Sequence, residues 1–494
     1  MENKFNYYFI GHNFEYEARN ALRVFDLNIP YEVKHISEFE FDYGLCLISS
    51  LQENNGKYVG SAKLYNNKKL LFESVYSDNE IVIEKCDLKK LKRNLVVKTI
   101  HFCLKNYYKM SPDYGMLTGV RPVKILFTAL NNNKTIEEIN DILKNTYEVK
   151  EHKIKLMWDV LRIEKKYINE KINKQNYNLY IGIPFCPSKC SYCSFTSYVD
   201  QKESKVNSYI NTLIYEIEKT IILAKNKNLN LNSIYIGGGT PSFLNIEEIN
   251  KIFDVLKKYY DLSKINEISF EAGRPDTITK EKLICLKENF VSRISINPQT
   301  MNDETLKIIG REHSTDDIIE KYYLAKEIGF NSINMDMILG LPGEDVIDAK
   351  NTIEQIVKLR PDNITVHALS YKRNSALTNE SKQREMDYEL LHPMQQLTHE
   401  ICINESYMPY YMYRQKNIKG NLENIGYTLR GKESIYNIAI IEETETILGC
   451  GAGTSSKIMF EDNRHESIYN LKSLEEYIRR IDELILNKEN LLNE

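Results

Sequence analysis

The sequence has 494 residues, enough for two or three domains. Its 42% hydrophobic and 27% charged residues are typical of a globular protein, and a net charge of −4 gives no reason to expect nucleic acid or an anionic membrane as partner. Every apolar run is too short to span a bilayer, and residues 1–20 lack the pattern of a signal peptide. We therefore expect a cytoplasmic protein whose thiols stay reduced.

The first region, residues 1–170, is predicted to be an α+β domain of unknown role. Apolar residues recur every three or four positions in the helical segments, which include a lysine-rich helix that leads into the next region. The predicted strands cover 43–49, 57–65 and 68–77, and the predicted helices cover 98–110, 124–132 and 151–174.

The second region, residues 171–375, alternates apolar strands with amphipathic helices. The six predicted strands cover 178–185, 233–239, 267–273, 291–299, 332–342 and 363–371. This alternation predicts βαβ units and a parallel sheet. Six units favour an incomplete (β/α)6 barrel, with an open doubly wound sheet as the alternative. In either fold the site lies at the carboxyl ends of the strands.

The third region, residues 376–494, no longer alternates in this way. A helix is predicted over 392–406, followed by tyrosine-rich strands and a charged helix over 473–487. We expect a small α+β extension that covers the substrate.

Three of the nine cysteines, Cys186, Cys190 and Cys193, lie within eight residues, directly after a predicted strand. A zinc site needs a fourth ligand nearby, and the next histidine is His313. Three thiolates instead suit an iron–sulfur cubane that leaves one iron open. An incomplete zinc site and three packed cysteines stay open as alternatives.

The spacing C-x-x-x-C-x-x-C, with Tyr192 before the third cysteine, resembles the radical S-adenosylmethionine (SAM) superfamily, and the resemblance extends over about 178–372. It implies a [4Fe–4S] cluster on the three cysteines and SAM bound to the open iron. In that superfamily, electron transfer from the cluster breaks a carbon–sulfur bond of SAM and produces a 5′-deoxyadenosyl radical. The three cysteines are thus expected to be the metal ligands and essential for catalysis.

The resemblance also implies SAM contacts at the other strand ends. The glycines of IYIGGGTPS match a stretch that binds the SAM amino group, Glu271 matches a ribose contact, and Arg311 can pair with the SAM carboxylate. Each has a structural alternative, namely a tight turn, a capping carboxylate or an ordinary ion pair. The predicted cofactor contacts are Tyr180, Tyr192, Gly238, Gly239, Thr240, Glu271, Gln299, Arg311 and Asp336.

Four stretches resemble the HemZ-type coproporphyrinogen dehydrogenases of the HemN-like branch. They are MLTGVRPVKI (116–125), FEAGRPDTIT (270–279), PYYMYRQKNIKGNLENIGY (409–427) and ILGCGAGTSSK (447–457). This resemblance implies oxygen-independent decarboxylation of two propionates of coproporphyrinogen III, which gives protoporphyrinogen IX for haem. A low-potential donor such as ferredoxin or flavodoxin is expected, and two SAM molecules can bind in such enzymes. The branch usually carries histidine where this sequence has Gly182.

A substrate with four carboxylates should meet cations and hydrogen-bond donors. The candidates are Arg274, Arg373, Arg414, Gln415 and Lys416, with Tyr410, Tyr411 and Tyr413 as rings that could stack on pyrroles. The alternative is a solvated surface strand. Arg121 and Lys124 are weaker candidates, because Pro122 between them suits a helix start. We expect Cys450 to be a packing residue.

Other functions stay open within the same resemblance. One is a haem chaperone that holds the cluster and SAM without turnover, although such chaperones usually carry the histidine that Gly182 replaces. Another is a radical SAM methyltransferase that opens haem anaerobically. A structural iron–sulfur protein is the third, and it should fail to cleave SAM.

Overall fold

The computed structural model describes residues 5–25, 31–34, 44–78, 88–171, 173, 175–370, 387–415, 421–460 and 464–494. Two substrate candidates, Arg373 and Lys416, lie outside these residues. The chain divides into two compact units, Met1–Trp158 and Asp159–Glu494, and helix α5 (Glu151–Lys171) contains the boundary. The domain limits predicted from the sequence remain predictions.

The first unit has a five-stranded sheet in the order β2-β1-β3-β4-β5. Strand β1 is parallel to both neighbours, while β3, β4 and β5 form an antiparallel meander. Leu22, Leu47, Leu64 and Ile100 belong to one buried core between the sheet and its helices α1 and α2. The elements are β1 (Phe5–Ile10), α1 (Glu15–Phe25), β2 (Tyr31–Lys34), β3 (Leu45–Asn54), β4 (Lys57–Asn66), β5 (Lys69–Ser77), α2 (Leu88–Tyr108), α3 (Val123–Asn131) and α4 (Ile136–Asp141).

The second unit contains all six predicted strands and the helices between them. They are β6 (Asn176–Ile183), α6 (Glu203–Asn226), β7 (Asn230–Gly238), α7 (Ile246–Tyr259), β8 (Glu267–Glu271), α8 (Lys280–Glu288), β9 (Arg293–Ser295), α9 (Asp303–Ile308), α10 (Thr315–Ile328), β10 (Ser332–Leu339), α11 (Val346–Leu359) and β11 (Asn363–Ala368). The strands are almost entirely buried, which explains why they consist of nearly continuous runs of apolar residues.

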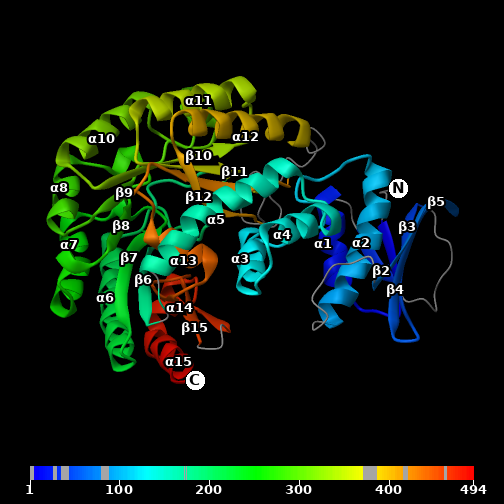
Figure 1. Cartoon of the computed structure of the whole chain (residues 1–494). Coiled ribbons are helices and arrows are strands. Elements are labelled where there is room, and N and C mark those ends of the chain that lie inside the picture. Colours follow the sequence, from blue (N-terminus) through cyan, green and yellow to red (C-terminus); the bar gives the residue numbers. More distant parts are fainter. Residues whose placement is uncertain are drawn as a thin grey trace. The chain divides into compact units, whose positions relative to one another are not determined.

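These six strands are parallel neighbours in the order in which they occur in the chain. A doubly wound sheet would reverse its strand order part of the way across, so this alternative is wrong. Helices α6, α7, α8, α10 and α11 form an outer arc around the strands (Figure 1). The result is an α/β fold with (β/α)6 strand order, as predicted.

The chain after residue 387 adds strands to both edges of this same sheet. Strand β13 pairs antiparallel with β11, whereas β14 pairs in parallel with β6, so that the sheet has eleven strands among the described residues. The elements are α12 (Asp387–Asn404), β12 (Met408–Tyr413), β13 (Asn424–Thr428), α13 (Ile435–Glu442), β14 (Thr446–Cys450), β15 (Ser455–Met459), β16 (His465–Tyr469), α14 (Leu474–Arg479) and α15 (Ile481–Asn493). The expected final helix is therefore two helices that meet at Arg480.

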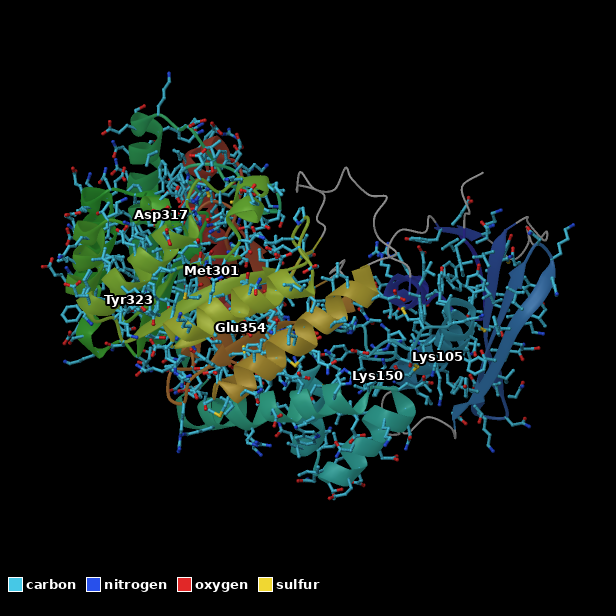
Figure 2. The ribbon with its side chains drawn as sticks, turned by 90° about the horizontal axis from the view of Figure 1, so that it is seen from above. Lys105, Lys150, Met301, Asp317, Tyr323 and Glu354 are labelled. Carbon is cyan, nitrogen blue, oxygen red and sulfur yellow. The ribbon has the colours of Figure 1, made fainter. Side chains whose placement is uncertain are left out.

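Local sequence explains where the outer helices begin. Asn245 and Glu248 form a capping box at α7, and Ser314 and Asp317 form one at α10. Asp317 and Tyr323 of α10 lie on the outside of the second unit, where Tyr323 is 54% exposed (Figure 2). None of the helices in the described part of the chain has the length and apolar character needed to cross a membrane.

Candidate functional site

The cysteine loop begins after β6 and is tied to the turn that follows α9. Within the loop, the Cys193 amide donates to the Cys190 carbonyl at 3.1 Å. The Ser191 amide donates to the carbonyl of Ile309 at 3.0 Å. Cys190 is buried, and Cys186 and Cys193 are half-buried. Burial raises the pKa of the Cys186 and Cys193 thiols, whose charges act on each other across the loop.

The three cysteines supply the type of donor that an iron–sulfur cluster requires. Among the described residues, no three His, Cys, Asp or Glu side chains lie close enough to share one metal ion. A cubane spreads its thiolate ligands over separate iron atoms, so the thiolates need not converge on one point. The three cysteines also lie in one loop, which a backbone hydrogen bond from Cys193 to Cys190 holds together. We conclude that the donors suit the cluster that the sequence predicts.

The glycine run at the end of β7 lies directly against the cysteine loop. Gly238 has a φ of +116°, which favours glycine. A Cβ on Gly239 would lie 3.0 Å from the Cys186 sulfur. The Gly239 amide donates to the Ile183 carbonyl at 2.8 Å, and the Thr240 hydroxyl donates to the Cys186 sulfur at 3.4 Å. The run thus allows β7 to approach the cysteines closely.

Glu271, at the end of β8, is held by its neighbours on β7. Its carboxylate accepts from the Tyr235 hydroxyl at 2.5 Å and from the Gly238 amide at 3.2 Å. A Cβ on Gly237 would lie 2.9 Å from the carboxylate carbon. Burial raises the pKa of Glu271 to about 7, although the Tyr235 bond opposes the shift. Glu271 is therefore a paired carboxylate, in agreement with the structural alternative. Each of its oxygens accepts one hydrogen bond and keeps a second lone pair that a ligand can use.

Tyr180 belongs to a stack of three tyrosines beside this carboxylate. Its ring stacks on Tyr235 at 6.0 Å and on Tyr436 at 6.3 Å, and the latter two rings are 4.5 Å apart. Burial raises the pKa of all three phenols. Tyr235 and Tyr436 were not predicted as site residues, although the tyrosine in SIYIGGG was a visible signal.

Gln299, after β9, adopts a left-handed backbone conformation with a φ of +67°. Its backbone amide donates to the backbone carbonyl of Asp336, and its backbone carbonyl accepts from the Ile338 amide, each at 2.9 Å. The side-chain oxygen Oε1 is buried and has no hydrogen-bond partner among the described residues. Such strain and an unused acceptor are typical of a ligand site.

Asp336, on β10, faces a histidine that the sequence analysis missed. His367 Nε2, from the neighbouring strand β11, lies 3.8 Å from Asp336 Oδ2, and Asn334 donates to Oδ1 at 2.7 Å. Burial raises the pKa of Asp336, but His367 and Asn334 lower it more, so that the pKa lies below its usual value. The signal was a single histidine in the otherwise uncharged strand NITVHA.

Arg311 joins the ends of two strands to the cysteine loop. It donates to the carbonyls of Gly273 and Asn297 at 3.3 and 2.6 Å and to the Tyr192 hydroxyl at 3.1 Å. Its Nε is buried without a hydrogen bond to any described residue. Arg311 and Tyr192 are therefore placed at the site, and the predicted pairing with a SAM carboxylate remains a prediction.

Most substrate candidates of the third region are buried in the core or hydrogen-bonded to other side chains of the chain. Tyr410 and Tyr411 are only 1% and 5% exposed and belong to a core with Tyr167, so the surface-strand interpretation is wrong for them. Arg414 donates to Asn421, and Gln415 donates to Tyr413 at 3.4 Å. Stacking on pyrroles remains a prediction for the half-buried Tyr413.

Three other expectations concern single positions. Pro122 immediately precedes α3, which agrees with the helix-start interpretation. Arg121 and Lys124, beside it, lie in the first unit. Cys450 is fully buried against the Thr220 hydroxyl at 3.4 Å, and burial raises the pKa of its thiol to about 12, so the packing role is confirmed.

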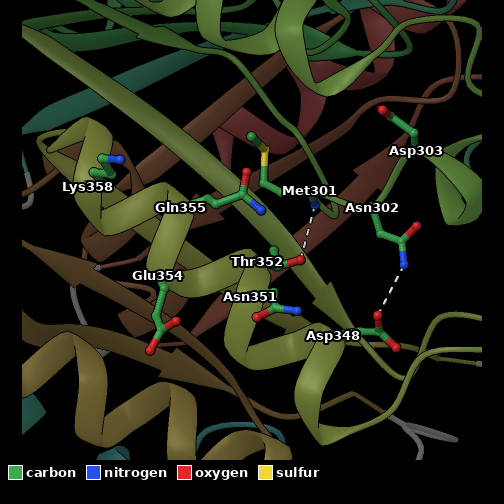
Figure 3. Close-up of a pocket in the computed structure, with 9 residues that line it drawn as sticks. All are labelled: Met301, Asn302, Asp303, Asp348, Asn351, Thr352, Glu354, Gln355 and Lys358. Carbon is green, nitrogen blue, oxygen red and sulfur yellow. Dashed lines mark hydrogen bonds between the residues drawn. The ribbon is translucent and has the colours of Figure 1, made fainter.

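A groove of about 460 Å³ lies elsewhere, between α11 and the start of α9 (Figure 3). Its lining contains none of the predicted site residues. Thr352 already accepts from the Met301 amide at 3.1 Å, and Asn302 donates to Asp348 at 3.1 Å. The groove is a polar surface feature and not the candidate site.

Known proteins resemble both the sequence and this fold. A family model described as the radical SAM superfamily matches residues 180–356. The oxygen-independent coproporphyrinogen-III oxidase-like protein HemZ of Bacillus subtilis is 42% identical over 363 residues, which are 73% of this chain and 72% of that protein. The heme chaperone HemW of the same organism is 36% identical over 201 residues, 40% of this chain and 52% of that protein.

A solved structure agrees with the fold. Coproporphyrinogen III oxidase (HemN) from Escherichia coli, described as a radical SAM enzyme, aligns with a TM-score of 0.52. The alignment covers 64% of this chain and 71% of that chain, at 22% sequence identity. The likeness supports the same α/β fold.

Proposed function

The chain belongs to the HemN/HemZ/HemW family of the radical SAM superfamily, and we propose that it converts coproporphyrinogen III to protoporphyrinogen IX without oxygen. Members of this superfamily bind a [4Fe–4S] cluster and SAM. Each of two propionates would lose one hydrogen atom to a 5′-deoxyadenosyl radical, one carbon dioxide, and one electron to an external one-electron acceptor, and so become a vinyl group. The observation that carries the proposal is the 42% identity to the coproporphyrinogen-III oxidase-like protein HemZ.

The residues of this chain supply binding and orientation. When bound, the cluster and SAM supply a 5′-deoxyadenosyl radical able to take hydrogen from an unactivated carbon. Cys186, Cys190 and Cys193 would hold the cluster. Glu271, fixed by Tyr235, is suited to accept hydrogen bonds from ribose hydroxyls, because its carboxylate is already oriented.

Three further side chains would complete the SAM site. Gln299 offers an unused buried acceptor, and Arg311 offers an unused buried donor among the described residues. Asp336, held between Asn334 and His367, offers a fixed carboxylate for an amine or hydroxyl. These groups surround the end of one sheet, where ligands bind in folds of this class.

A haem chaperone is the second candidate, because the HemW proteins also match this chain. The histidine usual in those proteins would occupy the place of Gly182. A Cβ at that position would lie 2.5 Å from Thr454 Cγ2, so that a side chain there requires the Thr454 methyl group to move. The absent histidine speaks against a chaperone that depends on it, and it equally excludes any role that a HemN-type dehydrogenase gives to a histidine at this position.

The test is an anaerobic turnover assay on the reconstituted protein with SAM, a low-potential reductant and coproporphyrinogen III. We expect protoporphyrin-type product together with 5′-deoxyadenosine, both measured by mass spectrometry. Deoxyadenosine without any change in the porphyrinogen would contradict the proposed substrate. A parallel haem titration would then show saturable binding for a chaperone, and methylated tetrapyrrole would indicate the haem-opening methyltransferase.

A further inference from the structure

Arg274, in the turn after β8, points its guanidinium at the cysteine loop. Its Nη1 donates to the Ser188 hydroxyl at 2.7 Å and to the Ser188 carbonyl at 3.3 Å. The same nitrogen lies 3.9 Å from the Cys190 sulfur, within reach of a long hydrogen bond. Arg274 is only 3% exposed, so these contacts are shielded from solvent.

The opposite side of the guanidinium is held by Asp276. Nε and Nη2 of Arg274 donate to the two carboxylate oxygens at 3.0 Å each, as a bidentate pair. His313, which is buried, lies 3.5 Å from the same carboxylate. Each of the three guanidinium nitrogens therefore has a partner within the protein, and the predicted role of Arg274 as a ligand for substrate carboxylates remains a prediction.

The two charges lie at different distances from the cysteine sulfur. The Nη1 corner of Arg274 faces Cys190, whereas Asp276 bonds the far side of the guanidinium. In a buried setting the nearer charge has the larger effect, although the farther one reduces it. Reduction potentials of iron–sulfur clusters depend on net charge and on hydrogen bonds to the sulfurs.

We propose that Arg274 is a positioning residue that clamps the cysteine loop through Ser188 and raises the reduction potential of the cluster held by Cys190. One-electron reduction adds one negative charge, which a fixed guanidinium beside the ligand sulfur favours. Asp276 fixes the guanidinium and limits this effect. The proposal rests on the cofactor of the family and is independent of which tetrapyrrole is bound.

The experiment measures the reduction potential of the reconstituted cluster in full-length Arg274→Gln and Asp276→Asn variants. Dithionite with mediators supplies the electron, and electron paramagnetic resonance reports the reduced fraction. We expect Arg274→Gln to lower the reduction equilibrium constant about tenfold, which is about 59 mV for one electron. Asp276→Asn should change it in the opposite direction, because it leaves the guanidinium charge uncompensated.

Two further variants separate charge from folding. Arg274→Lys keeps the charge without the bidentate fork, and we expect it to keep the potential near that of the wild type but to lower the iron content. Arg293→Gln removes another buried arginine, one that bonds the Ser332 hydroxyl and the Lys432 carbonyl and should leave the potential unchanged. Equal potentials in all loaded variants, or shifts of the same sign in Arg274→Gln and Asp276→Asn, would overturn the proposal, whatever the porphyrinogen assay shows.

Discussion

Buried polar groups at the amino ends and at the carboxyl ends of the parallel strands differ in their hydrogen bonding. At the amino ends, the Glu445 carboxylate accepts four hydrogen bonds at 2.7–2.9 Å. Their donors are the Asn173 amide and the side chains of Asn176, Asn178 and Asn232. At the carboxyl ends, Gln299 Oε1, Asn297 Oδ1 and Arg311 Nε are buried without hydrogen bonds to any described residue.

Arg293 Nη2, at the amino end of β9, is an exception, since it too is buried without a hydrogen bond to any described residue. For the other groups, the contrast separates polar groups that stabilise the fold from groups that we propose as ligand contacts. Glu267, at the start of β8, follows the first pattern, since it accepts from the Ser434 hydroxyl and the Ile435 amide at 2.8 Å. A buried polar group without a partner costs about 1–3 kcal/mol. Several such groups at one edge of a sheet therefore indicate a site that a bound molecule completes.

The largest effect should come from the cysteine loop. We expect Cys186→Ala, Cys190→Ala and Cys193→Ala each to abolish cluster binding and SAM cleavage, because each removes one of three thiolate ligands. Iron content and 5′-deoxyadenosine formation measure the two losses. Cys450→Ala, a buried cysteine outside the loop, is the control that should retain both. Retained cleavage in all three loop variants would contradict the site.

A fold-stabilising role for the amino ends predicts a large stability loss for Glu445→Gln. The new amide group would face side-chain donors, so that unfolding should become easier by about 3 kcal/mol, the cost of leaving buried hydrogen-bond donors unsatisfied. Denaturant unfolding of the apo protein measures the change, with the exposed Glu489→Gln as control. The folded fraction of Glu445→Gln should bind as much iron per molecule as the wild type. Loss of iron at unchanged stability would contradict a purely fold-stabilising role for Glu445.

The raised pKa of Glu271 predicts that the stability of the folded protein decreases as the pH rises. Its folded pKa of about 7 is raised above the usual value, so the folded state binds the proton more tightly than the unfolded chain. Stability from this group is present at low pH and is lost as the pH rises to about 7, by roughly 3 kcal/mol. Glu271→Gln should flatten this part of the unfolding profile of the apo protein between pH 4.5 and pH 8. An unchanged profile would show that the carboxylate titrates normally.

The same variant tests the ligand role. We expect Glu271→Gln to raise the SAM concentration needed for half-maximal cleavage by about tenfold, since one charged hydrogen bond is worth about 1.5 kcal/mol. Glu344→Gln, which alters another buried carboxylate bonded to Thr300, serves as the control with unchanged SAM dependence. An equal effect in the two variants would point to a general loss of packing.

The smallest effect should come from Gly182→Ala, which adds one methyl group against Thr454. Overpacking of this kind costs about 1–3 kcal/mol. Thr454→Ser removes the opposing Cγ2, so the double variant should regain most of the lost stability in thermal unfolding. Additive destabilisation in the double variant would show that the contact is not the cause.

Local patterns were sufficient for the elements of the parallel sheet and for the cysteine loop. Buried strands such as β10 carry continuous apolar text, and the capped helices between them have their own start signals. The spacing of Cys186, Cys190 and Cys193 was visible without any fold, because the predicted ligands lie in one loop. The six strands and their order in the sheet were predicted correctly.

Contacts between distant segments were not predictable in this way. The sequence shows Arg274 as a cation near a strand end, but only the fold brings Ser188, Cys190 and Asp276 to its three nitrogens. His367 similarly meets Asp336 through the register of two neighbouring strands.

The sequence alone determined the family and the α/β fold with its parallel strands, and it supplied the prediction that Cys186, Cys190 and Cys193 are the cluster ligands, because these depend on residues close together in the chain. Only the tertiary structure decided that the last hundred residues extend both edges of the same sheet. It also decided that Tyr410 and Tyr411 are buried and that Arg274 bonds Ser188 in the cysteine loop. These outcomes depend on which side chains occupy the same space after folding, and that is a property of strand pairing and packing between segments far apart in sequence.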